Sequence, residues 1–151
     1  MDSGFGRRLR VAWLRQVMAA ALDGADATGA SVSLFITDDA TVRELNRTYR
    51  GKDSATDVLS FSLTEGSLTE GELVPTTPDG ARHLGEVVIS LPQAERQAQA
   101  IGQSLGREVA FLIIHGVLHL LGYGHERPAE ERIMRAMQRR LVKRVQEGVG
   151  F

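Results

Sequence analysis

Three histidines in the last third of the chain have a spacing that suits a metal ion. They are His115, His119 and His125, and the residues between them are apolar or glycine apart from one tyrosine. Residues four apart lie on one face of a helix, so a helix here makes the first two imidazoles neighbours. Gly122 permits a sharp turn that returns the third imidazole to the first two. Three imidazoles with one position left open are typical of a catalytic zinc site.

The residues around these histidines narrow the chemistry. The stretch from Phe111 to Leu121 is apolar nearly all round, and burying two imidazoles there costs free energy unless each finds a partner. A metal ion would give both imidazoles a partner. Zinc proteases with this spacing carry a glutamate directly after the first histidine as general base, but Gly116 stands at that position. We therefore expect metal chemistry other than the usual proteolysis. Gly116 itself either clears space beside the metal or packs closely against a strand.

Composition and charge predict one globular domain over residues 1–151. The chain has 151 residues, a formal charge of −1 and no cysteine, so its metal ligands must be His, Asp or Glu. The near-neutral charge excludes a generally polybasic nucleic-acid binder but permits a local basic groove. No secretory signal pattern opens the chain, and the apolar stretch 111–123 is shorter than the ~20 residues of a membrane span. We expect a cytoplasmic protein with neither DNA nor membrane as partner.

Apolar periodicity predicts the order α-β-α-β-(β)-β-α-α-α. The predicted strands cover 31–37, 58–63 and 84–90, with a short strand near 72–74 inside a loop over 64–82. The predicted helices cover 11–24, the residues after the caps Asp38 and Asp39, 90–105, 106–121 and 128–147.

These elements predict an α/β (α+β) fold. Its expected form is a single small mixed β-sheet of three to four strands packed by about five helices, with the metal site on a central buried helix. The expected inward residues of the second helix are Val42, Leu45 and Tyr49. Those of the last helix are Ile133, Met137, Leu141 and Val145.

Three blocks of the sequence resemble the signature of one family. The block from His115 to His125 follows the pattern His-Gly-x-Leu-His-Leu-x-Gly-Tyr-Asp-His except at Gly124. The other blocks cover 45–53 with 56–61, and 84–90. In their types and order they resemble the YbeY family of bacterial metal-dependent endoribonucleases, which act in ribosomal RNA maturation.

The resemblance implies site residues and a cofactor. By it, His115, His119 and His125 hold one Zn²⁺ ion per chain, and Arg50 acts in catalysis together with the first two histidines. The guanidinium of Arg50 suits this role because it can hold a phosphate with two hydrogen bonds, which lysine cannot reproduce. The expected substrate contacts are Arg50, Lys52 and Asn46.

The implied function is that of a zinc-dependent, single-strand-specific endoribonuclease, a hydrolase of RNA phosphodiester bonds. It would act in 3′-end maturation of small-subunit ribosomal RNA and in ribosome quality control. The implied partners are ribosomal RNA, the small ribosomal subunit and its proteins, or an assembly GTPase. Two alternatives stay open, a non-catalytic ribosome-assembly factor with a structural metal and a metal-dependent hydrolase of another substrate.

Three positions depart from the family pattern without touching the expected ligands. Gly124 and Glu86 stand where the family usually has Asp, and Gln138 stands where it tends to have Glu. Losing a carboxylate beside a ligand can change metal affinity or activity about 10–100-fold, and Glu126 offers one on the other side of His125.

Basic residues are the expected means of holding RNA, because the chain has few aromatic residues for base stacking. Arg47, Arg50 and Lys52 lie close in sequence and can line a local groove. The last helix carries a run that is either a solvated face or a contact for RNA, made up of Arg132, Arg135, Arg139, Arg140, Lys143 and Arg144.

Overall fold

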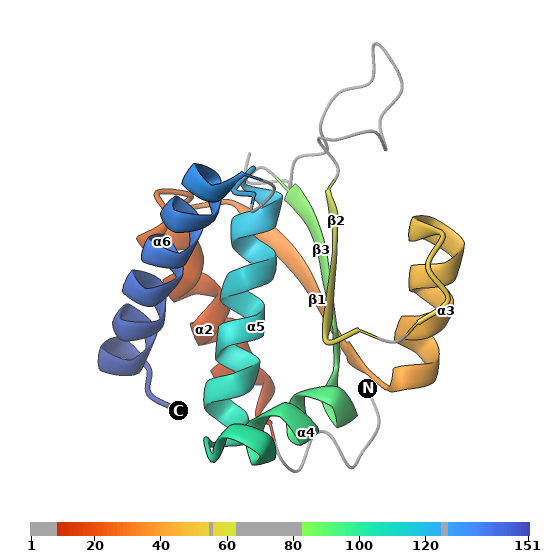
Figure 1. Cartoon of the computed structure of the whole chain (residues 1–151). Coiled ribbons are helices and arrows are strands. Elements are labelled where there is room, and N and C mark those ends of the chain that lie inside the picture. Colours follow the sequence, from red (N-terminus) through yellow and green to blue (C-terminus); the bar gives the residue numbers. More distant parts are fainter. Residues whose placement is uncertain (1–8, 55, 63–82, 125–126) are drawn as a thin grey trace.

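A three-stranded sheet with helices on both faces forms the frame of the protein (Figure 1). The computed structural model describes residues 9–54, 56–62, 83–124 and 127–151. The strands are β1 (Ser31–Thr37), β2 (Val58–Ser62) and β3 (His83–Ser90), in the order β1-β3-β2. The central strand β3 pairs in parallel with β1 and antiparallel with β2. This confirms the predicted mixed sheet, while the predicted strand at 72–74 lies outside the described residues.

The helices also confirm the predicted order. They are α2 (Val11–Gly24), α3 (Asp39–Arg50), α4 (Leu91–Ile101), α5 (Leu105–Leu120) and α6 (Pro128–Gly148). Figure 1 shows α3 on one face of the sheet and α2, α5 and α6 on the other. No helix in the described part of the chain has both the length and the apolarity to cross a bilayer.

Side-chain caps explain where several helices begin. Asp38 accepts a hydrogen bond from the Thr41 amide at 2.8 Å, and Ser90 accepts one from the Gln93 amide at 3.4 Å. The predicted boundary near Leu105 is wrong by about four residues. The chain leaves α4 at Gly102, which has a left-handed conformation, and Ser104 caps α5.

The main core lies between the sheet and α5, which also contacts α2, α4 and α6. Val87 and Ile89 of β3 belong to this core, whereas Val88 packs with Val42 and Leu59 under α3. Alternate residues of a strand point to opposite faces, so β3 serves both layers. The position of α5 is therefore set by packing on several sides.

The inward faces of α3 and α6 differ from the prediction. Tyr49 is 68% exposed and Ile133 is 59% exposed. Asn46 is buried on α3, and the buried residues of α6 are Met134, Gln138, Leu141 and Val145. Each buried stripe therefore includes a polar residue that apolar periodicity alone does not select.

Candidate functional site

Two of the three predicted metal ligands meet on α5. The Nε2 atoms of His115 and His119 lie 3.1 Å apart, with ring centroids 4.6 Å apart and ring planes at 73°. A tetrahedral zinc ion with Zn–N bonds of 2.0–2.1 Å holds two nitrogens about 3.3 Å apart. Both rings are half-buried and one helical turn apart. The pair therefore fits a metal bound through both Nε2 atoms.

The predicted turn after this helix is present. Gly122 has a φ of +96°, and its amide donates to the carbonyl of His119 at 3.0 Å while the Tyr123 amide donates to that of Leu118 at 3.0 Å. These two bonds form a Schellman motif, which reverses the chain directly after a helix. His125 lies outside the described residues, and within them no three metal-ligating side chains gather. Its part in metal binding thus stays a prediction.

His115 has two further neighbours that the sequence did not predict. Its ring stacks on that of Phe111, with centroids 6.3 Å apart and planes at 21°. The Nε2 atom of Gln138 lies 3.5 Å from His115 Nδ1. The oxygen and nitrogen of a glutamine amide are assigned from their surroundings, and the opposite assignment lets the Gln138 oxygen accept a hydrogen bond from the Nδ1–H group of His115. That bond leaves the Nε2 lone pair of His115 for a metal.

Close packing against the sheet explains Gly116. A Cβ at this position would lie 2.7 Å from Cγ1 and 2.8 Å from Cγ2 of Val87. The carbonyl of Gly116 also accepts a hydrogen bond from Ser60 Oγ at 3.3 Å. Of the two explanations that the sequence left open, the structure therefore supports packing against a strand.

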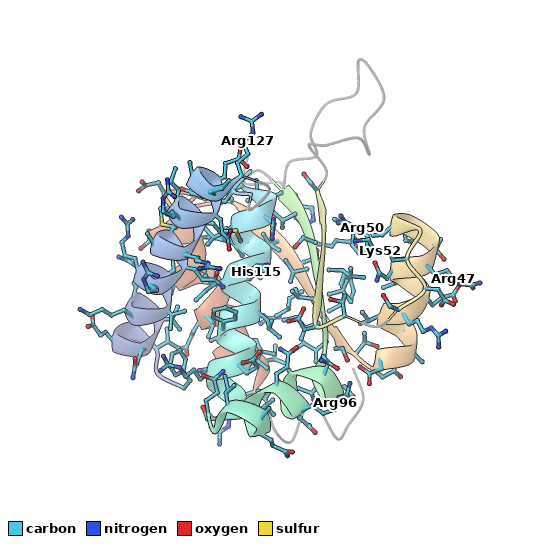
Figure 2. The ribbon with its side chains drawn as sticks, viewed as in Figure 1. Arg47, Arg50, Lys52, Arg96, His115 and Arg127 are labelled. Carbon is cyan, nitrogen blue, oxygen red and sulfur yellow. The ribbon has the colours of Figure 1, made fainter. Side chains whose placement is uncertain are left out.

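Arg50 lies on the other side of the sheet from His115 (Figure 2). Its Nη2 donates to the carbonyl of Ser60, and its guanidinium carbon lies 5.4 Å from the centroid of the Phe61 ring. Ser60 in turn bonds Gly116, which follows His115. The structure thus connects Arg50 to the histidine helix through Ser60 and does not place it against the imidazoles.

The other predicted substrate residues lie near the end of α3. Asn46 is 5% exposed, and its side-chain amide donates to the carbonyl of Ser54 at 2.9 Å. The backbone carbonyl of Asn46 accepts a hydrogen bond from the Lys52 amide at 3.3 Å. Asn46 therefore orders the loop after α3, and its contact with a substrate stays a prediction. The side chain of Lys52 is exposed.

Acidic neighbours offset most of the positive charge on α3. Arg47 bonds both carboxylate oxygens of Glu44 at 2.7 Å, and Arg43 bonds Asp53 at 2.8 Å. These hydrogen bonds lower the pKa of the Glu44 and Asp53 carboxyl groups below their ordinary values. The expected basic groove at the end of α3 is consequently weaker than the sequence predicts.

A carboxylate lies beside Gly124. A Cβ at this position would be 3.4 Å from Glu130 Oε2, near the start of α6. The sequence-based candidate Glu126 falls outside the described residues. Glu130 thus provides a negative charge close to the place where the family pattern has an aspartate.

Comparison with known proteins decides the family. The family model described as Endoribonuclease YbeY matches residues 7–146. The chain belongs to the YbeY endoribonuclease family. Two curated relatives, both named Endoribonuclease YbeY, support this over nearly the whole chain. The Moorella thermoacetica protein is 46% identical over 150 residues, which cover 99% of this chain and 92% of the relative. The Dehalococcoides mccartyi (strain BAV1) protein is 44% identical over 147 residues, which cover 95% of this chain and 92% of the relative.

A solved structure matches the fold of this YbeY family member. The solution structure of TM1509 from Thermotoga maritima aligns with a TM-score of 0.62, covering 91% of this chain and 84% of that one. At 24% sequence identity it supports the fold alone.

Proposed function

We propose that this chain is a zinc-dependent, single-strand-specific endoribonuclease that matures the 3′ end of small-subunit ribosomal RNA and takes part in ribosome quality control. Membership of the YbeY family makes it an endoribonuclease, a hydrolase acting on RNA. The observation that carries the metal part of the proposal is the approach of His115 Nε2 and His119 Nε2 to 3.1 Å. We further propose that it acts in the cytoplasm with the small ribosomal subunit and its proteins or an assembly GTPase.

The chain offers a definite set of residues for the ion. His115 and His119 would hold it through Nε2, with His125 as the third ligand and Gln138 orienting His115 through Nδ1. A bound zinc ion supplies Lewis acidity toward an anionic phosphate oxygen. Three neutral imidazoles leave the charge of the ion intact, which suits a phosphodiester better than a site rich in carboxylates. Cleavage of a small-subunit ribosomal RNA fragment by the zinc-loaded protein but not by His119→Ala tests the proposal.

Arg50→Ala is expected to reduce RNA cleavage by about 10-fold or more while the zinc content per chain stays unchanged. A guanidinium that binds a phosphate contributes charge-assisted hydrogen bonds of about 1.5–3 kcal/mol. In the structure Arg50 bonds the backbone carbonyl of Ser60, on the other side of the sheet from His115. Parallel cleavage assays and metal analysis measure both effects. Arg43→Ala, on the same helix but paired with Asp53, is the matched control. Loss of zinc from Arg50→Ala would contradict the assigned role.

Gln138→Leu is expected to weaken zinc binding about 10-fold, because His115 loses the neighbour that orients it. The measurement is competition with a chromophoric zinc chelator at fixed pH. Gln138→Glu supplies a carboxylate acceptor and should retain most of the affinity. Gln146→Leu, an exposed position two turns further along α6, controls for the loss of an amide. Equal zinc affinities in Gln138→Leu and Gln146→Leu would show that Gln138 does not position the ligand.

A further inference from the structure

A groove leads away from His115 between α5 and α6. It has a volume of about 860 Å³, and the end of α4 closes one side of it. Among the residues that line it are Phe111 and His115 of α5, and Arg135, Arg139 and Lys143 of α6. Since α5 and α6 run in opposite directions (Figure 1), the groove follows α6 past His115, which faces Gln138, and on toward the C-terminal end of that helix.

Positive charge lines the α6 wall of the groove. Arg135, Arg139 and Lys143 recur every four residues, so they share one face at intervals of about 6 Å along the helix axis. Arg135 pairs with Glu131. Arg139 and Lys143 are exposed, and in the described part of the chain neither makes an ion pair or a side-chain hydrogen bond. Their charges are available to an anion.

The other carboxylate that lines the groove is that of Glu108, which is buried and bonds neutral groups. Glu108 is 4% exposed, and its two oxygens accept hydrogen bonds from the side-chain amides of Gln97, at 2.7 Å, and Gln103. Each of its two oxygens therefore bonds a neutral amide of the fold. The groove keeps a cationic wall, in which Arg139 and Lys143 lie about one and two turns of α6 beyond Arg135.

An aromatic ring lies on the floor beside the histidine. Phe111 is 39% exposed and parallel to the ring of His115 within 21°. Met134 and Val142 add apolar surface around it. An aromatic platform next to a cationic wall is the combination that single-stranded nucleic acids use, with bases stacked and phosphates paired to basic side chains.

We propose that this groove is the track along which a single RNA strand reaches His115, with Phe111 stacking a base and with Arg139 and Lys143 binding backbone phosphates. The inference rests on the proposed function and names the binding surface for its substrate. The groove extends along α6 from Glu131 to Gln146, which is about 22 Å of helix. At 3.4 Å per phosphate of one stacked strand, this length accommodates roughly six nucleotides.

The test compares two double variants that remove the same charge. Arg139→Gln/Lys143→Gln removes the two unpaired positive charges from the α6 side of the groove. Arg15→Gln/Arg132→Gln removes two exposed positive charges that do not line the groove. The zinc-loaded proteins are assayed for KM and kcat on a short single-stranded ribosomal RNA from about 0.05 to 0.2 M salt. We expect the groove variant to raise KM at least about 10-fold, and to flatten the slope of log affinity against log salt by about 1.4, since each contact contributes about 0.7. The control should match the wild type.

Anisotropy of the same labelled RNA, measured with chelator present, separates this inference from the proposed function. RNA binding that depends on Arg139 and Lys143 without any His119-dependent cleavage would support the groove and refute the nuclease activity. Conversely, His119-dependent cleavage with the same KM and salt slope in both double variants would overturn the groove as the RNA track. Loss of binding to a ribosomal protein, with RNA binding intact, would also overturn it and make the groove a protein-docking surface.

Discussion

His119→Ala is expected to abolish zinc binding and to reduce RNA cleavage by at least about 10²-fold. The substitution removes one of the two nitrogens that approach to 3.1 Å on α5. Loss of the ion removes its Lewis-acid stabilisation of the transition state, which contributes several kcal/mol. Each 1.36 kcal/mol corresponds to a factor of ten in rate. The measurement is cleavage of a structured small-subunit ribosomal RNA fragment, together with the zinc content of each preparation.

The control for this experiment is a second histidine of the same chain. His83 lies at the start of β3, and its Nδ1 lies 2.8 Å from Ser31 Oγ of β1. His83→Ala, purified identically, should keep zinc and cleavage, whereas contaminating nucleases would cause cleavage in the His119→Ala preparation as well. Equal cleavage by the wild type and His119→Ala would refute a nuclease site at this histidine pair.

The His119→Ala variant also distinguishes a catalytic metal site from a structural one. The α5 helix is held by fully buried apolar residues on several sides, among them Leu112, Ile113, Ile114, Val117 and Leu118. Structural zinc sites contribute folding free energy directly and unfold when stripped. Because this core does not involve the imidazoles, metal-free His119→Ala should keep the circular dichroism spectrum of the wild type. An unfolded variant would instead favour the assembly factor with a structural metal.

Gly85→Ala is expected to be the most destabilising single-methyl change, costing about 3 kcal/mol or more of the free energy of unfolding. Gly85 has a φ of +150° in β3, and a Cβ there would lie 2.2 Å from the carbonyl oxygen of Phe61 in the paired strand β2. A backbone atom cannot rotate away as a side chain does, so the two strands must separate. Urea unfolding followed by circular dichroism measures the loss.

Gly102→Ala is the matched control for this substitution. Gly102 has a φ of +69° at the end of α4, and nothing lies within 4 Å of the position of its Cβ. Its replacement by alanine therefore lowers the free energy of unfolding only by the cost of placing a Cβ on a left-handed backbone, about 1–2 kcal/mol. A Gly85→Ala protein as stable as Gly102→Ala would contradict the collision between the strands.

Helix spacing and turn chemistry correctly predicted the approach of His115 to His119 and the turn that follows them. The four-residue interval between His115 and His119 fixed their common face, since that periodicity is a property of any α-helix. Gly122 predicted the reversal because a left-handed residue after a helix favours glycine. The caps at Asp38 and Ser90 were likewise predictable, as each side chain bonds an amide only three residues away.

Buried polar residues account for the errors on α3 and α6. Gln138 lies on the buried stripe of α6 because it faces His115, and Asn46 lies on that of α3 because it bonds the carbonyl of Ser54. Apolar periodicity did not include these two positions among the inward residues, and it predicted that Tyr49 and Ile133 point inward. The partners of a buried polar group come from distant segments, so local hydrophobicity cannot identify them.

The sequence by itself determined the family, the order of the elements and the pairing of two imidazoles on one helix, because these depend on motifs and on short-range geometry. Only the tertiary structure decided that Gly116 makes room for Val87, that Arg50 bonds Ser60 across the sheet from His115, and that Phe111 lies in a groove with the cations of α6. Each of these depends on which residues of one element approach another. That approach is set by the packing of all the layers together and is not encoded within any one segment.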